Sequence, residues 1–192
     1  MSRVSIVVAA ILVAIGIASG AGKHSSASDG PRLFGPVARL VAALRWVEVR
    51  EAFDRGEPAR AFAVAETALA IDPGATEGWC LLVERQLLTD ASSLREPDGA
   101  RRRAWIESAL DTAERGVRSA RDPGRVEFTA ALGLLVQATD ESPPPWPTGV
   151  AGLRNDARRW FERALEHGVG AAREFLVDTD EEAPGSVQDR DS

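Results

Sequence analysis

The sequence is poor in the side chains on which most enzymes and metal proteins depend. It has 192 residues with one cysteine, Cys80, two histidines, His24 and His167, and no tyrosine. A single cysteine excludes an intramolecular disulfide and any multi-cysteine metal site. The two histidines lie too far apart in the sequence to indicate a local metal-binding or catalytic pair. The only lysine, Lys23, precedes the body of the chain, which argues against Schiff-base chemistry.

Sequence motifs of nucleotide and acyl-transfer chemistry are also missing. The chain has no phosphate-binding loop, no dinucleotide fingerprint and no nucleophile elbow. The acidic run 178–182 lacks the spaced ligands and the glycine of a calcium loop. We therefore expect a protein that is not an enzyme and that binds no cofactor and no metal.

The net charge of −6 is concentrated at the C-terminal end. Residues 177–192 hold most of the acidic excess, so the rest of the chain is nearly neutral. A protein without a basic excess has no electrostatic attraction for nucleic acid, and we expect none as a partner. The run Arg101–Arg103 is the one basic cluster, and its simplest interpretation is a solvated helix start. Residues 177–192 are predicted to form a disordered acidic tail.

The N-terminal segment, residues 4–22, carries no charge and follows Arg3. It is long enough to cross a bilayer as a helix, and Gly16 and Gly20 have the spacing that packs two membrane helices. The alternative is a secretory signal cleaved at the small residues 18–21. Either interpretation places the domain outside the cytoplasm, in the periplasm or the extracellular space. It is membrane-anchored in the first case and secreted in the second.

The body of the chain, residues 37–176, follows a Ser-, Gly- and Pro-rich stretch, 23–36, that is typical of a flexible linker. Apolar residues in the body recur at steps of three and four, as in Ile106, Leu110 and Ala113. Strict alternation of apolar and polar residues, which would indicate strands, is not found. The predicted fold class is all-α.

Two junctions in the body have the same sequence. Asp72-Pro73-Gly74 and, fifty residues later, Asp122-Pro123-Gly124 each separate one helical pattern from the next. Proline removes a backbone donor and glycine frees the turn, so each triplet ends one helix and starts another. An aromatic residue follows each junction, Trp79 in one case and Phe128 in the other. The repetition predicts stacked helical hairpins.

These residues resemble the tetratricopeptide repeat family, in which small residues at fixed spacing precede a Leu and a terminating Pro. The first unit matches most closely and the next two are degenerate; the matching positions are Gly56, Ala61, Ala68, Leu69, Pro73, Trp79, Leu82, Ala109, Ala113, Phe128, Leu132, Ala157, Phe161, Ala164 and Leu165. The resemblance covers about residues 42–168. It implies a short right-handed solenoid of antiparallel helix pairs.

Two long insertions, about residues 90–100 and 140–152, interrupt the second and third units. Each falls between the first and second helix of its unit, and equivalent joints of a stacked array lie on one edge. We therefore expect the two insertions to be neighbours. Trp146, within a proline-rich stretch, is a candidate partner contact, because long loops often carry binding residues. The alternative is that Trp146 folds back and caps a groove between helices.

The resemblance also implies a function, since tetratricopeptide proteins are mostly scaffolds whose first helices line a groove for a partner segment. Carried onto this chain, the groove would draw on Trp46, Arg50, Phe53, Glu77, Glu84 and Leu87. The sequence thus predicts a membrane-tethered or exported scaffold for protein–protein interaction in the cell envelope. Frequent Arg and Ala with a single Lys suggest a bacterial source. The alternative is a self-associating structural membrane protein, a homo-oligomer without a peptide-binding groove.

Overall fold

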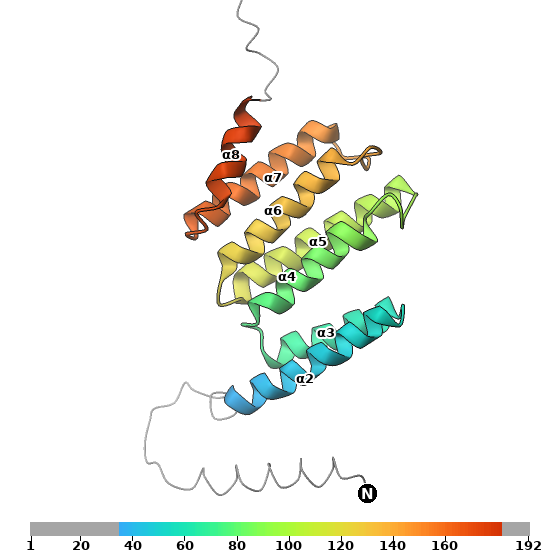
Figure 1. Ribbon diagram of the computed structural model, residues 1–192, viewed down its shortest axis with the longest axis vertical. Coiled ribbons are helices and arrows are strands. Elements are labelled where there is room, and N and C mark those ends of the chain that lie inside the picture. The colour runs from blue at the N-terminus through green and yellow to red at the C-terminus, as the bar shows by residue number, and fades with distance from the viewer. Residues whose placement is uncertain (1–34, 182–192) are drawn as a thin grey trace, which may run out of the picture. The chain divides into compact units, whose positions relative to one another are not determined.

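The computed structural model describes residues 35–181, with side chains over residues 37–176, and in this part of the chain all regular secondary structure is helical. The all-α prediction is therefore confirmed for residues 35–181. The elements are α2 (Gly35–Asp54), α3 (Pro58–Ile71), α4 (Thr76–Glu84), its π-helical continuation η2 (Arg85–Asp90), α5 (Gly99–Ser119), α6 (Pro123–Thr139), α7 (Gly149–Glu166) and α8 (Ala172–Glu181) (Figure 1).

The predicted boundaries at the two ends of the body shift by a few residues. Helix α2 begins at Gly35, inside the predicted linker 23–36, and α8 continues to Glu181, inside the predicted tail 177–192. The uncharged segment 4–22, with Gly16 and Gly20, lies outside the described residues. Among the helices of residues 35–181, none has the length and apolar character needed to span a membrane.

Helix boundaries follow the local sequence signals. Gly56, with φ of +73°, ends α2, and Pro58 opens α3 in its first turn. At the second Asp-Pro-Gly junction the Asp122 carboxylate accepts a hydrogen bond from the Arg125 backbone N–H at 3.1 Å. This is an N-cap, and it satisfies a donor that the first turn leaves free. Gly168, with φ of +89°, follows α7 in the left-handed conformation that favours glycine.

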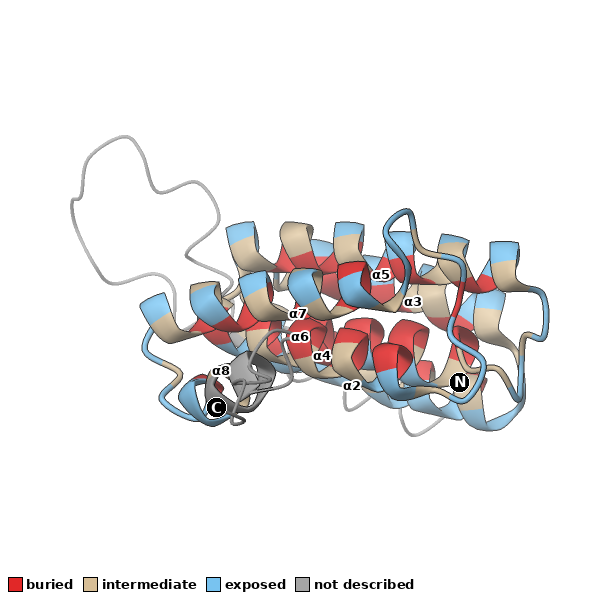
Figure 2. Ribbon diagram, turned by 90° about the horizontal axis from the view of Figure 1, so that it is seen from above, coloured by how far each residue is buried: buried red, intermediate tan, exposed pale blue. Residues whose placement is uncertain are grey.

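The helices pair as α2/α3, α4/α5 and α6/α7 (Figure 1), and each pair contributes one helix to each of two layers. Figure 2 shows the buried residues facing the space between the layer of α2, α4 and α6 and the layer of α3, α5 and α7. Much of this core is alanine, and the fully buried positions include Ala61, Ala65, Ala109, Ala113, Ala130, Ala131, Ala157 and Ala164. Small side chains at the contact let helices approach closely.

The two insertion loops lie side by side, as the sequence predicted. The Ser93 hydroxyl in the first loop donates to the Asp140 carboxylate at the start of the second, at 3.0 Å. A Cβ placed on Gly99 would lie 2.8 Å from Pro145. Long segments from two different helix pairs therefore close against each other along one edge.

Arg102 joins these loops, and its placement corrects the interpretation of the arginine run as solvated. Only 2 % of Arg102 is exposed, whereas the neighbouring Arg101 side chain is 75 % exposed. The Arg102 guanidinium donates to the Ala91 carbonyl at 2.8 Å and to the Ser142 carbonyl. It also donates to the Gln137 side chain at 3.0 Å and to Asp140 at 3.1 Å, its remaining partners. A buried cation with several acceptors is the condition under which arginine is stable inside a protein.

Candidate partner-binding groove between α2 and α4

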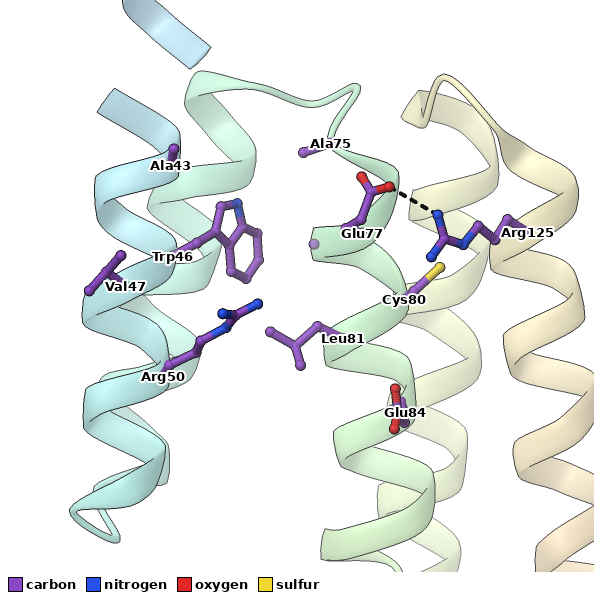
Figure 3. A pocket seen from close by; sticks show the side chains of 11 residues that line it. Ala43, Trp46, Val47, Arg50, Ala75, Glu77, Cys80, Leu81, Glu84 and Arg125 are labelled. Carbon is purple, nitrogen blue, oxygen red and sulfur yellow. Dashed lines mark hydrogen bonds and ion pairs between the residues drawn. The ribbon is translucent and has the colours of Figure 1, made fainter. Parts of the chain in front are cut away.

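A groove of about 460 Å³ lies between α2 and α4 and reaches α6 (Figure 3). It brings together four of the six predicted groove residues, Trp46, Arg50, Glu77 and Glu84. The remaining lining residues are Ala43, Val47, Ala75, Gly78, Cys80, Leu81 and Arg125. The predicted groove thus corresponds in large part to one concave surface.

Trp46 sets the width of this groove. Its indole projects from α2 toward α4 (Figure 3) and packs on Gly78, where a Cβ would lie 2.2 Å from the indole Cζ2 atom. Any larger residue at position 78 would displace the ring. The indole is only partly buried, so it both touches α4 and presents apolar surface to the groove beside Val47 and Leu81.

Two charged side chains face the groove without an ion-pair partner among the described residues. Figure 3 shows the Arg50 guanidinium on α2 directed into the groove and Glu84 on α4 at the opposite wall. Both are exposed. Glu77 and Arg125, by contrast, form an ion pair at 2.9 Å between α4 and α6. Among the described residues, the groove therefore has an unpaired cation, Arg50, on one side of its apolar surface and an unpaired anion, Glu84, on the other.

The Cys80 thiol lies in the groove wall but is only 9 % exposed. Burial raises the pKa of this thiol, while a hydrogen bond with Thr129 and the charge of Arg125 act in the opposite direction. A thiol with a raised pKa is a poor nucleophile at neutral pH. In this position Cys80 acts as a small, mostly buried residue of the groove wall.

Phe53 and Leu87 do not line the groove. Phe53 packs edge-on against Phe62 of α3, with ring centroids 5.5 Å apart, and the Arg85 guanidinium lies 4.6 Å from its centroid. Leu87 is fully buried, with its side chain against Gly133 of α6. This corrects the prediction that Leu87 contacts a partner. The π-helical η2 has a wider turn than an α-helix, so helical spacing extrapolated from α4 fails beyond Glu84.

Other groove residues escaped the sequence prediction although a signal for them exists. Ala43, Val47 and Arg50 follow each other at steps of four and three on α2. Glu77, Leu81 and Glu84 do the same on α4. Extending the stripe from each predicted residue by one helical turn finds Ala43, Val47 and Leu81. Arg125 comes from α6, and no spacing on α2 or α4 points to it.

Trp146 folds back onto α7. Its indole N–H donates to Asp156 at 2.9 Å, and its ring lies against Gly152. The Arg103 guanidinium lies 5.9 Å from the ring centroid. The side chain therefore fastens the proline-rich loop to α5 and α7, which is the alternative that the sequence left open.

Within residues 37–176, no group of three or more His, Cys, Asp or Glu side chains is placed to hold a metal ion. Comparison with models of known protein families, with curated proteins and with solved structures gives no match for this chain. The function proposed below is argued from the residues and their geometry.

Proposed function

We propose that this protein is a membrane-tethered or exported scaffold whose groove between α2 and α4 takes an amphipathic segment of a protein partner. The single observation that carries this proposal is the convergence of Trp46, Arg50 and Glu84 on one concave surface. Recognition sites of this kind combine an apolar anchor pocket with a few placed polar groups.

The groove specifies the chemistry of the segment. Apolar side chains on one face of the segment would cover Trp46, Val47 and Leu81. An acidic residue on one edge would pair with Arg50 and a basic residue on the other edge with Glu84. A partner helix laid into an apolar groove presents such anchors at steps of three and four residues. The partner expected here is therefore amphipathic, with charges of both signs at its border.

The resemblance to tetratricopeptide repeats supports the same assignment. The helices follow each other in the order that such repeats would give, in which α2 and α4 would be the first helices of the first two units. Recognition of a partner's terminal carboxylate by paired Lys and Asn is not part of the proposal, because the repeat region has no Lys and Asn155 is its only Asn.

The test is crosslinked affinity capture of the full-length protein from its native membranes, followed by mass spectrometry. The groove variants are Arg50→Glu and Glu84→Arg. The matched control is Arg118→Glu, which reverses an exposed charge in the last turn of α5, away from the groove. We expect a discrete partner whose recovery falls at least about tenfold in the groove variants, which corresponds to about 1.4 kcal/mol, and is unchanged in the control.

Equal recovery of the partner by all three variants would overturn the groove assignment. Capture of the chain alone, equally by every variant, would favour the self-associating structural alternative. The membrane part of the proposal is tested separately. Retention of the protein in alkali-washed membranes supports an anchor, whereas a mature N-terminus near residues 18–21 supports secretion after cleavage.

A further inference from the structure

The outer face of α2 is unusually apolar for a surface. The large apolar side chains that are at least 40 % exposed in the described chain include four on this one helix, Leu40 at 54 %, Val41 at 40 %, Leu44 at 64 % and Val47 at 55 %. Others, such as Leu88, Leu94 and Val136, are scattered over separate elements. Single exposed apolar residues are ordinary, but a cluster on one helix marks an interaction surface.

This cluster lies opposite the side of α2 that packs on the core. Leu40, Leu44 and Val47 follow each other at steps of four and three, which places them on one stripe. Ala42 and Val49, with 2 % and no exposure, face the core on the other side. The first half of α2 is thus apolar on both sides. A helix that is apolar all round has a partner on each side, and the core accounts for only one.

Two arginines flank the apolar stripe of α2, and no acidic residue lies within it. Over residues 37–47 the only charged residues are Arg39 and Arg45. At 100° per residue they fall on opposite flanks of the stripe. The first acid, Glu48, accepts hydrogen bonds from Arg45 at 2.8 Å and Arg60 at 3.5 Å. The Arg45 hydrogen bond is the main cause of the lowered pKa of Glu48.

The place of α2 in the chain indicates what lies against this face. Helix α2 is the first helix after the uncharged segment 4–22, and the intervening stretch 23–34 reaches at most about 40 Å when fully extended. If segment 4–22 is in a bilayer, α2 is held close to the lipid surface. An apolar stripe flanked by arginines is what a helix lying in the interface requires, because the guanidinium groups reach the headgroups.

A second copy of the chain fits this face less well. A stable protein interface buries about 800 Å² on each partner, and four partly exposed side chains on half of one helix provide much less. A bilayer has no such minimum area, because the membrane segment already holds α2 near the lipid and each apolar group that enters the headgroup boundary adds to the binding.

We propose that the outer face of the first half of α2, formed by Leu40, Val41 and Leu44, lies on the membrane surface. There its apolar side chains enter the headgroup boundary, and Arg39 and Arg45 contact anionic headgroups. Trp46 and Arg50 face α4 (Figure 3), and Val47, at the border of the apolar face, lines the groove with them, so the groove stays available to a partner. The inference rests on the membrane tethering in the proposed function and does not depend on partner capture.

The test uses full-length protein reconstituted in vesicles of mixed phosphatidylcholine and phosphatidylglycerol. Cys80→Ala removes the only cysteine, and Leu44→Cys then carries a bimane or nitroxide label. The matched control label is Arg118→Cys, on an exposed site of α5. We expect brominated lipid to quench bimane at position 44 several-fold more strongly than at 118. The quenching should fall to the level of the control when Leu40→Glu is added.

Equal and weak quenching at positions 44 and 118 in a protein that has entered the vesicles would overturn the inference. Dipolar broadening of a nitroxide at position 44 without lipid quenching would assign the face to a second copy instead. Protein that stays outside the vesicles would overturn the inference together with the membrane tether. Strong quenching with normal partner recovery in the Arg50→Glu variant would contradict the groove assignment alone.

Discussion

The two ends of the helical array are held together by different means. Between α2/α3 and the following helices the contacts are made by partly buried rings: Trp46 lies on Gly78, and Phe62 contacts both Phe53 and Trp105. Between the later helices the contacts are more deeply buried, and they include the fully buried Phe161 of α7, whose ring contacts Phe128 of α6 at 5.6 Å between centroids. Gly133 of α6 likewise lies against Leu87 of η2.

Buried polar groups reinforce the later helices as well. Glu127 of α6 is fully buried, and its carboxylate pairs with Arg163 of α7 at 3.0 Å. Its other oxygen lies 2.6 Å from the His167 ring nitrogen that follows α7. The comparison shows that the two ends differ in burial. The partly buried Trp46 lies between α2 and α4 beside an open groove, whereas η2, α6 and α7 meet through fully buried residues such as Leu87, Glu127 and Phe161.

The largest loss of stability is expected on removing Arg102, the buried cation that joins the two insertion loops. Arg102→Ala removes the guanidinium that donates to the Ala91 and Ser142 carbonyls and to Gln137. It also removes one donor from Asp140, which keeps its hydrogen bonds from Ser93 and from the Ser142 backbone N–H. Loss of one partner of a buried ionic network costs about 3 kcal/mol. Urea unfolding followed by circular dichroism measures this loss.

The control for that measurement is Arg101→Ala, since Arg101 is the adjacent, exposed arginine of the same run. Its expected cost is within about 0.5 kcal/mol of zero. Equal midpoints for the two variants would mean that the Arg102 network does not hold the two insertion loops together.

A pair of glycines tests the comparison directly. A Cβ at Gly78 would lie 2.2 Å from Trp46, and one at Gly133 would lie 2.3 Å from Leu87. Helix propensity favours both Gly→Ala changes equally. Because Leu87 is fully buried and Trp46 is not, we expect Gly133→Ala to cost about 1–3 kcal/mol more than Gly78→Ala. Equal free energies of unfolding would show that α2 is packed as rigidly as α6.

The sequence predicts the features that depend on local spacing. The helical class, the breaks at the Asp-Pro-Gly junctions and the adjacency of the two insertions all follow from periodicity and turn chemistry, and residues 35–181 bear them out. Trp46, Arg50, Glu77 and Glu84 lie where a first-helix stripe places them. These features depend on the local sequence and not on the distance between helix pairs.

The features that it misses depend on contacts between elements. A run of three arginines does not reveal that Arg102 alone meets acceptors from Ala91, Gln137 and Ser142, which come from other segments. The π-helical turn at Arg85–Asp90 changes which side chains face α6, and it buries Leu87. Arg125 reaches the groove only because α6 packs beside α4.

Asp140 and Asp90 should contribute to stability with opposite dependence on pH. The Ser142 backbone N–H, at 2.9 Å, is the main cause of the lowered pKa of Asp140. Its ionised form therefore stabilises the fold above the ordinary aspartate pKa of 3.8, and this contribution disappears as the pH falls through the lowered value. Asp140→Asn should cost about 1 kcal/mol at neutral pH and nothing once wild-type Asp140 is protonated.

Asp90 provides the opposite case, because burial raises its pKa, and the Arg85 and Arg95 charges lower it only in part. The protonated form is favoured in the folded protein, so its contribution is present below the ordinary pKa and is lost as the pH rises through the raised value. We expect Asp90→Asn to raise the unfolding midpoint at neutral pH and to leave it unchanged in acid. Parallel pH profiles for the two variants would contradict these assignments.

The smallest effect is expected for an exposed ion pair between α3 and α5. Arg115 of α5 holds Glu66 of α3 through two hydrogen bonds, at 2.9 Å and 2.6 Å. Their side chains are 37 % and 50 % exposed, respectively, so solvent screens the pair and its coupling should be about 0.5 kcal/mol. Arg115→Gln alone overstates this value, since the guanidinium also lies 5.4 Å from the Trp79 ring centroid.

A double-mutant cycle with Glu66→Gln separates the ion pair from the ring contact. Salt should reduce the measured coupling, because both groups are reached by solvent. A coupling well above 1 kcal/mol that resists salt would mean that α3 is fixed to α5 by a desolvated ion pair. The pairs α2/α3 and α4/α5, which supply the two walls of the groove, would then be fixed to each other, and the groove width could not adjust to the segment that it binds.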